Sequence, residues 1–244
     1  MLIGETATLT YICRKTAPAA INITAALRDV CFAAFPGRMT SEVAQLAEGF
    51  NLSLAPKEHL LHAGLANVNL ILHPPGMILA AAWIEHTAGQ FAYYYDAATP
   101  AVARVMERLD AERMAVAAAY GIVAQPFPAL FAAIGSTTEA AARSGSYLQA
   151  LRESAPNRHI QAPSSLDHRY LSEDIPYGLA PLADLAAGAR VPVPVMDSLI
   201  TLAGAVNQTD YRAAGRRLKE VGLEDMDPAA IVHRLVEGDS PPRR

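Results

Sequence analysis

The segment His73-Pro-Pro-Gly76 contains a residue type that could carry out proton transfer. An imidazole has an ordinary pKa of about 6.5 and therefore exchanges protons close to neutral pH. Proline lacks the backbone N–H that the first turn of a helix leaves unbonded, and it disfavours helical geometry in the preceding residue. We therefore expect His73 at the entry turn of a helix, not inside it, where it could face a cleft. The alternative is an ordinary histidine at a helix start, hydrogen-bonded at the surface or in the core.

A second pair of reactive side chains, Arg169 and Asp174, brackets a short segment that is closed by Pro176. A guanidinium offers two parallel donors in a fixed fork, which suits a substrate carboxylate. A carboxylate beside an imidazole fixes which ring nitrogen carries the proton. On spacing alone, a surface ion pair between Arg169 and Asp174 is the simpler interpretation.

Two other kinds of site find little support. His59 and His62 are three residues apart, but we see no cysteine or carboxylate beside them at a ligand spacing, so we expect no metal site. The other histidines, apart from His73, are scattered: His86, His159, His168 and His233. Ser136 and Ser146 each follow a glycine but lack the flanking pattern of a hydrolase nucleophile.

The composition indicates a packed, helix-rich globular protein. The 244 residues are 52% hydrophobic and 18% charged, with length for one large domain or two modest ones. A net charge of -4 gives no reason to expect nucleic acid or an anionic membrane as a partner. The only cysteines, Cys13 and Cys31, predict two free buried thiols and a cytoplasmic location.

An uncharged stretch, residues 114–138, resembles a membrane span at first sight. Gly121 and Pro126 interrupt it, and much of it is alanine. A buried helix pair joined by a proline turn is therefore the better interpretation.

Residues 1–67 read as a partial α/β segment. Residues 20–24 and 28–35 are rich in strand-forming types, and Thr40 or Ser41 is suited to cap a helix that ends at Gly49. That helix would present Val43, Leu46, Ala47 and Phe50 on one side. The sequence contains no G-x-G-x-x-G motif and no P-loop, so the segment would be only part of a dinucleotide-binding (Rossmann-like) domain.

Residues 68–244 read as an all-helical domain, which makes the fold mainly α. Thr99-Pro100 predicts an N-cap followed by a long helix that stops at Gly121. Within it, Asp110, Glu112 and Arg113 predict a solvated or interhelical row of salt bridges. Further helices are expected over residues 181–187 and 195–206 and from Asp227-Pro228 to Gly238.

Several motifs, in order, resemble the octopine/nopaline (opine) dehydrogenase family. They are His73-Pro-Pro-Gly-Met, Ile84-Glu, Gly89-Gln-Phe, Tyr94-Tyr-Asp, Thr99-Pro, Asp110-Ala-Glu-Arg, Arg169-Tyr-Leu-Ser-Glu-Asp-Ile-Pro-Tyr-Gly-Leu-Ala-Pro, Gly215-Arg-Arg-Leu and Gly222-Leu. The opening Gly4-Glu-Thr-Ala-Thr-Leu-Thr-Tyr-Ile-Cys-Arg resembles the closing half of that family's dinucleotide domain. The resemblance thus covers nearly the whole chain.

The resemblance implies a reaction and roles for three residues. Such enzymes join an amino acid to a 2-oxo acid through an imine, which NADH or NADPH then reduces. His73 would be the catalytic acid and base, Asp174 its catalytic partner, and Arg169 would bind the substrate carboxylate. The cofactor residues stay unassigned, because the glycine fingerprint of NAD or NADP binding is absent from the sequence.

Three alternatives follow from that absence. The chain could be a fragment or a mis-started product, a separate polypeptide could supply the cofactor half, or the chain could be a non-catalytic helical binding or dimerisation module. Half a sheet would also leave an unpaired strand edge, so we expect the chain to self-associate. A ketopantoate-type reductase has a similar two-domain plan, but its usual base is a lysine. The three lysines here, Lys15, Lys57 and Lys219, stand in no matching motif.

Overall fold

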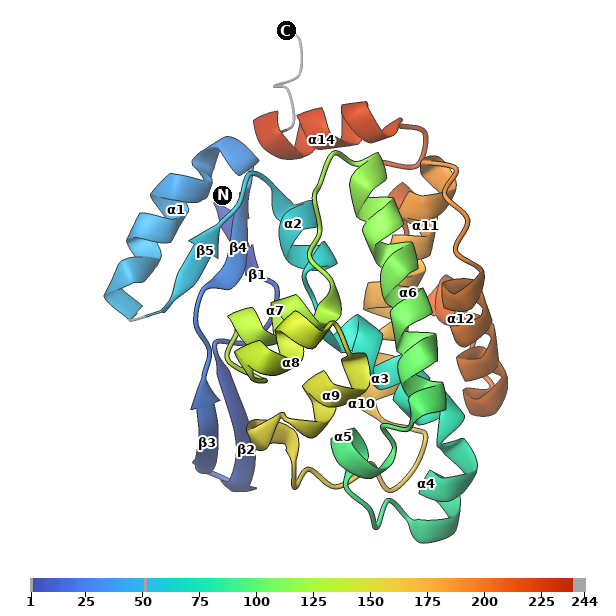
Figure 1. Ribbon diagram of the computed structural model, residues 1–244. Coiled ribbons are helices and arrows are strands. Elements are labelled where there is room, and N and C mark those ends of the chain that lie inside the picture. The colour runs from blue at the N-terminus through green and yellow to red at the C-terminus, as the bar shows by residue number, and fades with distance from the viewer. Residues whose placement is uncertain (1, 51, 239–244) are drawn as a thin grey trace, which may run out of the picture.

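The computed structural model describes residues 2–50 and 52–238, and it is mainly helical with two small sheets near the N-terminus (Figure 1). This confirms the predicted fold class. The sheets and α1 lie at one side of the molecule, while the later helices form the larger part.

The first sheet has the strand order β1-β4-β5. Strand β4 (Val30–Phe35) is central, β1 (Ile3–Thr6) pairs with it antiparallel, and β5 (Leu54–Pro56) pairs with it parallel. Val30 in this central strand is fully buried. The second sheet is a hairpin of β2 (Tyr11–Ala17) and β3 (Ala20–Ala26), which lies at the lower left of Figure 1, below α7 (Phe127–Ala133).

Helix α1 (Thr40–Ala47) lies beside the first sheet, between two 3-10 turns, η1 (Gly37–Met39) and η2 (Glu48–Phe50). The expected cap by Thr40 or Ser41 is wrong: the hydroxyl of Thr40 instead accepts a hydrogen bond from the backbone N–H of Ala34, at 3.0 Å. The apolar side of α1 and η2 is also incompletely covered, because Leu46 in α1 is 67% exposed and Phe50 in η2 is 75% exposed.

Helix α3 (Asn69–Leu79) follows the short α2 (Leu60–Leu65), and both prolines lie inside it. The prediction that His73 lies at the entry turn is therefore wrong, because the helix begins four residues earlier, where Asn67 accepts from the N–H of Asn69. Every residue from Leu70 to Met77 is buried. Packing on all sides of the helix outweighs the hydrogen bonds that the two prolines remove.

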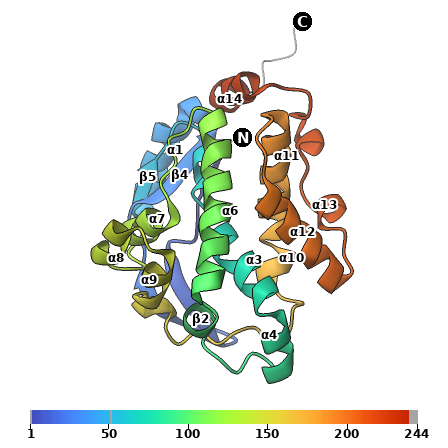
Figure 2. The same cartoon turned by 45° about the vertical axis from the view of Figure 1, so that its right-hand side comes forward.

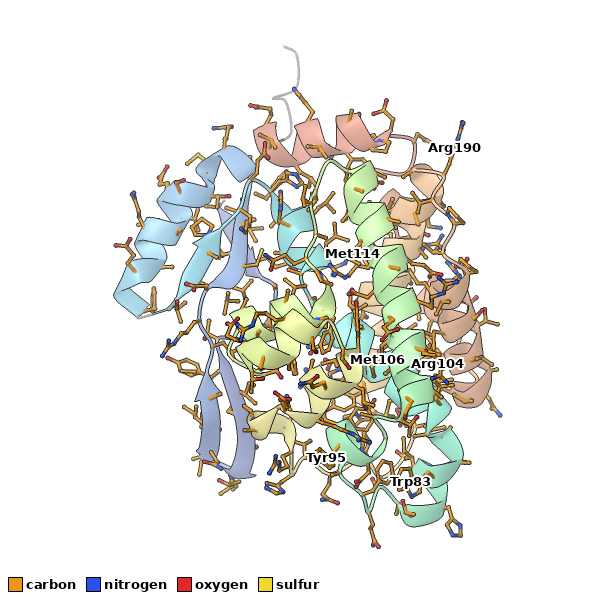
Figure 3. All side chains as sticks on the ribbon, viewed as in Figure 1. Trp83, Tyr95, Arg104, Met106, Met114 and Arg190 are labelled. Carbon is orange, nitrogen blue, oxygen red and sulfur yellow. The ribbon has the colours of Figure 1, made fainter. Side chains whose placement is uncertain are left out.

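The long helix α6 (Pro100–Ala119) stands at the centre, with the sheets and α7 on one side and α11 to α13 on the other (Figure 2). Thr99 caps it as predicted, accepting from the N–H of Val102 at 3.3 Å. Met106 faces the core from this helix and is 3% exposed, whereas Arg104 lies on its outer side (Figure 3). The helix contributes to one continuous hydrophobic core.

The other helices surround α6. They are α4 (Ala81–Thr87), α5 (Tyr93–Asp96), α7 (Phe127–Ala133), α8 (Glu139–Ser144), α9 (Tyr147–Arg152), the 3-10 turn η3 (Ala155–Asn157), α10 (Arg169–Ser172), the π-helical turn η4 (Ile175–Leu179), α11 (Ala180–Gly188), α12 (Pro194–Asn207), α13 (Tyr211–Ala214), the 3-10 turn η5 (Leu218–Val221) and α14 (Pro228–Glu237). Helices α11, α12 and α14 confirm the three helices expected in this part of the sequence.

The charged residues of α6 do not form the solvated or interhelical row that we expected. Asp110 and Arg113 form a buried ion pair at 2.6 Å, with side chains 0% and 1% exposed. The guanidinium also donates to the carbonyl oxygens of Leu65 and Gln125. Burying both charges is tolerated because each polar atom receives a partner, which a pattern of residue types does not reveal.

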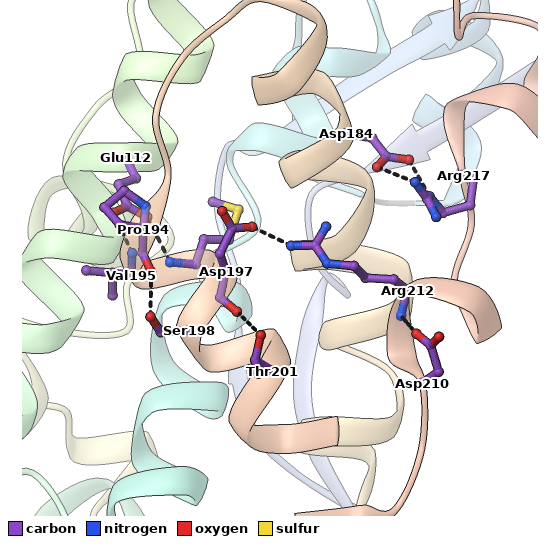
Figure 4. A network of polar contacts seen from close by, with 11 residues as sticks. Glu112, Asp184, Pro194, Val195, Asp197, Ser198, Thr201, Asp210, Arg212 and Arg217 are labelled. Atoms are coloured by element: carbon purple, nitrogen blue, oxygen red, sulfur yellow. Dashed lines mark hydrogen bonds and ion pairs between the residues drawn. The ribbon is translucent and has the colours of Figure 1, made fainter. Parts of the chain in front are cut away.

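Glu112, by contrast, reaches a neighbouring helix. Its carboxylate accepts from the N–H groups of Val195 and Met196, both at 2.8 Å, at the start of α12 (Figure 4). A negative charge there satisfies free N–H groups and complements the helix dipole. Arg212 pairs with Asp197 on the outer side of α12.

Two further expectations concern the cysteines and a possible membrane span. The thiol of Cys31 is free, as expected, but Cys13 and Cys31 are both half-buried instead of buried. In the described part of the chain no single helix is long and apolar enough to cross a membrane, although the bent pair Leu60–Leu79 and Ala81–Thr87 passes by length and composition.

Candidate active site

His73 and Asp174 meet although they are 101 residues apart. Nδ1 of His73 lies 2.6 Å from Oδ2 of Asp174, and the two side chains are only 7% and 14% exposed. Asp174 directly precedes η4, which packs against α3: a side chain on Gly178 would lie 2.1 Å from Leu70. Gly178 therefore permits the close contact that brings the carboxylate to the imidazole.

Two tyrosines complete the environment of the imidazole. Nε2 of His73 lies 2.7 Å from the hydroxyl oxygen of Tyr94, which lies 3.0 Å from the hydroxyl oxygen of Tyr170. The ring of Tyr170 also stacks on the imidazole, with centroids 3.6 Å apart and planes 10° apart. With Nδ1–H donating to Asp174, Nε2 accepts from Tyr94, and Tyr94 accepts from Tyr170.

Tyr93 supports the helix that carries His73. Its buried hydroxyl donates to the carbonyl oxygen of His73 at 2.8 Å. Burial raises the pKa of Tyr93 well above its ordinary value, and nearby Tyr170 and Asp174 raise it further. A side chain at Gly76 would lie 2.4 Å from this hydroxyl, so glycine there makes room for the bond.

Arg169 does not form the surface ion pair with Asp174 that the spacing alone favoured. Its guanidinium pairs with Glu173 at 3.1 Å, not with Asp174, and both side chains of that pair are more than half exposed. His168 precedes it and accepts from the N–H of Tyr170 at 3.3 Å. Burial lowers the pKa of His168, and the nearby His73 and Arg169 lower it further.

A cavity of about 540 Å³ opens between the β2–β3 hairpin and the helices. His73, Tyr94, Arg169 and Tyr170 line it, together with hairpin residues such as Tyr11. The acid/base candidate and the carboxylate-binding candidate therefore face one space. Asp174 stands behind His73 and holds the ring from the other side.

Sequence reasoning missed the tyrosines. The run Tyr94-Tyr-Asp96 entered only as part of the family resemblance, and Tyr93 was not considered, although tyrosines with buried hydroxyls need hydrogen-bond partners and often mark polar sites. Tyr170 follows Arg169 directly and could have been included with it.

The α/β segment offers no phosphate cradle in the part that the structure describes. A side chain at Gly4 would lie 2.5 Å from the ring of Phe32, and one at Gly37 would lie 2.2 Å from the carbonyl oxygen of Glu58. Both glycines thus serve internal packing. The described residues do not fit the diphosphate of NAD or NADP, which needs an open glycine-rich turn at a helix N-terminus.

A separate cluster corrects one expectation. Glu58 does stand beside His59 and His62 at a ligand spacing, and one ligand atom from each residue lies within 4.8 Å of the others.

The chain is similar to opine-forming enzymes in sequence. It is 30% identical to the opine dehydrogenase of Arthrobacter sp. (strain 1C) over 233 residues, which cover 94% of this chain and 62% of that protein. It is 28% identical to vitopine synthase of Allorhizobium ampelinum (strain ATCC BAA-846 / DSM 112012 / S4), over 70% of this chain and 46% of that protein. The chain therefore spans roughly half to three fifths of the length of these relatives.

Solved structures share its fold. Octopine dehydrogenase described with NADH and L-arginine matches all of this chain and 66% of its own, with a TM-score of 0.70 and 16% identity. Yersinopine dehydrogenase in its apo form matches 98% of this chain and 66% of its own, with a TM-score of 0.68 and 14% identity.

The family model for the α-helical domain of NAD/NADP octopine/nopaline dehydrogenase matches residues 56–207, the range that carries His73, Tyr94, Arg169 and Asp174. This chain therefore belongs to the octopine/nopaline dehydrogenase family.

Proposed function

We propose that this chain is the catalytic helical part of an opine-dehydrogenase-type oxidoreductase. The observation that carries the proposal is the 2.6 Å contact between His73 and Asp174 at a cavity that Arg169 also lines. The likeness to the Arthrobacter opine dehydrogenase and to octopine dehydrogenase described with NADH, L-arginine and pyruvate supports it. The substrates are then an amino acid and a 2-oxo acid.

The first half of the reaction needs proton transfer, which the site is built to provide. The amine nitrogen attacks the carbonyl carbon of the 2-oxo acid, a C–N bond forms, and the former carbonyl oxygen leaves as water. A base must accept a proton from nitrogen and an acid must deliver one to the departing oxygen. His73 does both through Nε2 and the hydroxyl of Tyr94 that is bonded to it, because Asp174 holds the proton on Nδ1.

Binding the substrate requires a cation that holds a carboxylate. Arg169 lines the cavity, and its present partner Glu173 is an exposed residue. An exposed ion pair is worth at most about 1 kcal/mol, so a substrate carboxylate could displace Glu173 at little cost. The fork of the guanidinium then fixes the 2-oxo acid near His73.

The imine is reduced by a hydride that NADH or NADPH supplies in this family, and we assign cofactor binding to a segment outside this chain. The apolar surface of α1 and η2 supports this assignment, because Leu46 and Phe50 are largely exposed beside the first sheet. Ile3 on β1 is also 49% exposed, and in the described part of the chain β1 has β4 as its only neighbour. Such a surface is suited to receive further strands, from the same polypeptide, a separate one or a second copy.

Calorimetry with the purified chain tests the cofactor assignment. We expect NADH and NADPH to bind the chain alone weakly or not at all. A micromolar dissociation constant would show that a phosphate site has been overlooked.

A hybrid enzyme tests the reaction. The chain is fused behind the cofactor-binding part of the Arthrobacter opine dehydrogenase, and NADH binding by the fusion is first verified by calorimetry. We expect NADH consumption that depends on both an amino acid and a 2-oxo acid, with a secondary amine as product by mass spectrometry. His73→Ala should abolish it, whereas His86→Ala, an exposed change on α4, should not. A fusion that binds NADH but forms no product would favour the non-catalytic binding or dimerisation module.

A further inference from the structure

Glu58, His59 and His62 form a compact group at the junction between β5 and α2, at the start of the region that the family model matches. One ligand atom from each of the three side chains lies within 4.8 Å of the other two. The two imidazole rings lie side by side, with centroids 4.7 Å apart. His59 is the residue before the first turn of α2, and its side chain makes no capping bond there.

His59 shows an independent sign that a ligand is needed. His59 is only 2% exposed, and its Nδ1 has no hydrogen-bond partner among the described residues. Buried polar atoms in folded proteins nearly always have a partner, and an exception calls for an ion or another group that satisfies it. An imidazole nitrogen without a proton is a ready metal ligand.

We propose that Glu58, His59 and His62 bind one divalent transition-metal ion, with Zn²⁺ as the representative. Two imidazole nitrogens and one carboxylate oxygen are ligands that Zn²⁺ accepts, and water would fill a fourth position. The mixed nitrogen and oxygen set disfavours Mg²⁺ and Ca²⁺, which take oxygen ligands. Bonds of about 2.0–2.1 Å place neighbouring ligands of a tetrahedral ion about 3.3 Å apart, so small side-chain rotations would close the site.

The site lies apart from the acid/base histidine. His62 lines a different cavity, together with Lys57 and Cys31, and His73 does not belong to it. The positive charge of Lys57 opposes a cation nearby, so we expect a micromolar rather than a tighter dissociation constant. A bound ion would tie the end of β5 to α2 and thereby join the α/β segment to the helices. Its role would be to stabilise the fold, not to take part in the reaction.

The test uses the full chain without an affinity tag, because an added histidine tag would bind the same metals. Zn²⁺ binding is measured by calorimetry, and Co²⁺ binding by visible absorption. We expect one ion per chain, and His62→Ala should weaken binding by about tenfold or more, which corresponds to the loss of one good ligand. Glu58→Gln should weaken it less, and His86→Ala, which removes an exposed histidine on α4, should leave it unchanged.

Thermal unfolding gives a second readout that needs no enzyme activity. Because the ion would bind only the folded chain, Zn²⁺ should raise the unfolding temperature of the unmodified chain, and should raise that of His62→Ala by clearly less at the same concentration. Mg²⁺ at the same concentration should have no effect. Circular dichroism verifies that each variant is folded; His62 is only half-buried, so its replacement is the safer test than that of His59.

Two results would overturn the proposal. One is the absence of saturable binding at millimolar Zn²⁺. The other is binding whose affinity is the same in His62→Ala as in the unmodified chain, which would place the ion elsewhere.

Discussion

The hydroxyl of Tyr94 is hydrogen-bonded to Nε2 of His73, the ring nitrogen that faces away from Asp174. With Asp174 at Nδ1 and Tyr94 at Nε2, both ring nitrogens have partners within 2.7 Å. A proton that enters or leaves the imidazole on the cavity side must therefore pass through the oxygen of Tyr94 or displace it. When His73 gains a proton, Nε2–H donates to Tyr94 and Tyr94 donates to Tyr170, so the chain of hydroxyls reverses direction.

Replacing Tyr94 by phenylalanine should therefore slow the reaction while leaving the fold intact. In the hybrid enzyme we expect kcat to fall by about a hundredfold, the lower end of what acid/base catalysis contributes. Tyr95→Phe is the matched control, because that ring lies on the same short helix and is 39% exposed. An unchanged rate in Tyr94→Phe would exclude a relay through this hydroxyl.

Arg169 should affect substrate binding more than the chemical step. Arg169→Ala removes the fork that we assign to the 2-oxo acid, so its KM should rise by about tenfold or more, as expected for a lost charged hydrogen bond. Glu173→Gln removes the competing carboxylate 3.1 Å away and should lower KM or leave it unchanged. Steady-state kinetics with the amino acid held constant measure both. An equal rise of KM in the two variants would point to a structural ion pair.

At the scale of the elements, α3 marks where sequence reasoning succeeded and failed. The helix at His73 was predicted, and so were the cap at Thr99 and the helices that became α11, α12 and α14. The start of α3 was not predicted, because the rules for proline consider only the local backbone and the hydrogen bonds that proline removes. Here burial from Leu70 to Met77 and the hydroxyl of Tyr93 decide the geometry, and both come from distant parts of the chain.

The contact between Gly76 and Tyr93 gives a stability test for this element. Gly76→Ala places a methyl group 2.4 Å from the hydroxyl oxygen of Tyr93 and should cost about 1–3 kcal/mol of unfolding free energy by overpacking. Adding Tyr93→Phe should recover part of that loss, since the clashing oxygen is gone. Gly64→Ala in α2, where nothing lies within 4 Å, should instead stabilise by up to about 1 kcal/mol. Denaturant unfolding measures all three, and additive effects of the first two changes would contradict the contact.

His168, the N-cap residue of α10, should make the free energy of unfolding depend on pH. Burial lowers the pKa of His168 below its ordinary value of 6.5, so the folded chain binds this proton less readily than the unfolded chain does. The resulting stability is present above pH 6.5 and is lost as the pH falls below it. Protonation also removes the acceptor that holds the N–H of Tyr170. In urea unfolding between about pH 7 and pH 5, His168→Gln should therefore lose less stability than the unmodified chain; parallel curves would contradict this.

At the scale of the whole molecule, the site depends on contacts that bring separate segments together. The family motifs predicted that His73 and Asp174 would converge, but their types and spacing alone gave no reason for them to do so. The tyrosines around the imidazole and the buried pair on α6 escaped prediction for the same reason: each side chain's burial and partners are set by the fold. Catalytic roles for His73, Arg169 and Asp174 remain predictions.

The buried pair on α6 holds several of these segments in place. Arg113 donates to the carbonyls of Leu65 and Gln125, and Asp110 accepts from the N–H of Phe127 and the hydroxyl of Tyr147. Burial raises the pKa of Tyr147, and its hydrogen bond to Asp110 raises it further. The pair thus connects the end of α2, the start of α7 and α9 to one turn of the central helix.

Arg113→Met should consequently destabilise the whole chain. It leaves Asp110 as a buried charge without its cation and leaves two carbonyls without donors, which should cost about 3–5 kcal/mol of unfolding free energy. Arg212→Met is the matched control, because it also removes an arginine from an ion pair, but Arg212 and Asp197 are 36% and 51% exposed. Breaking that pair should cost less than about 1 kcal/mol. Urea unfolding followed by circular dichroism compares the two variants, and similar losses in both would mean that water or a rearranged side chain compensates Asp110 in the interior.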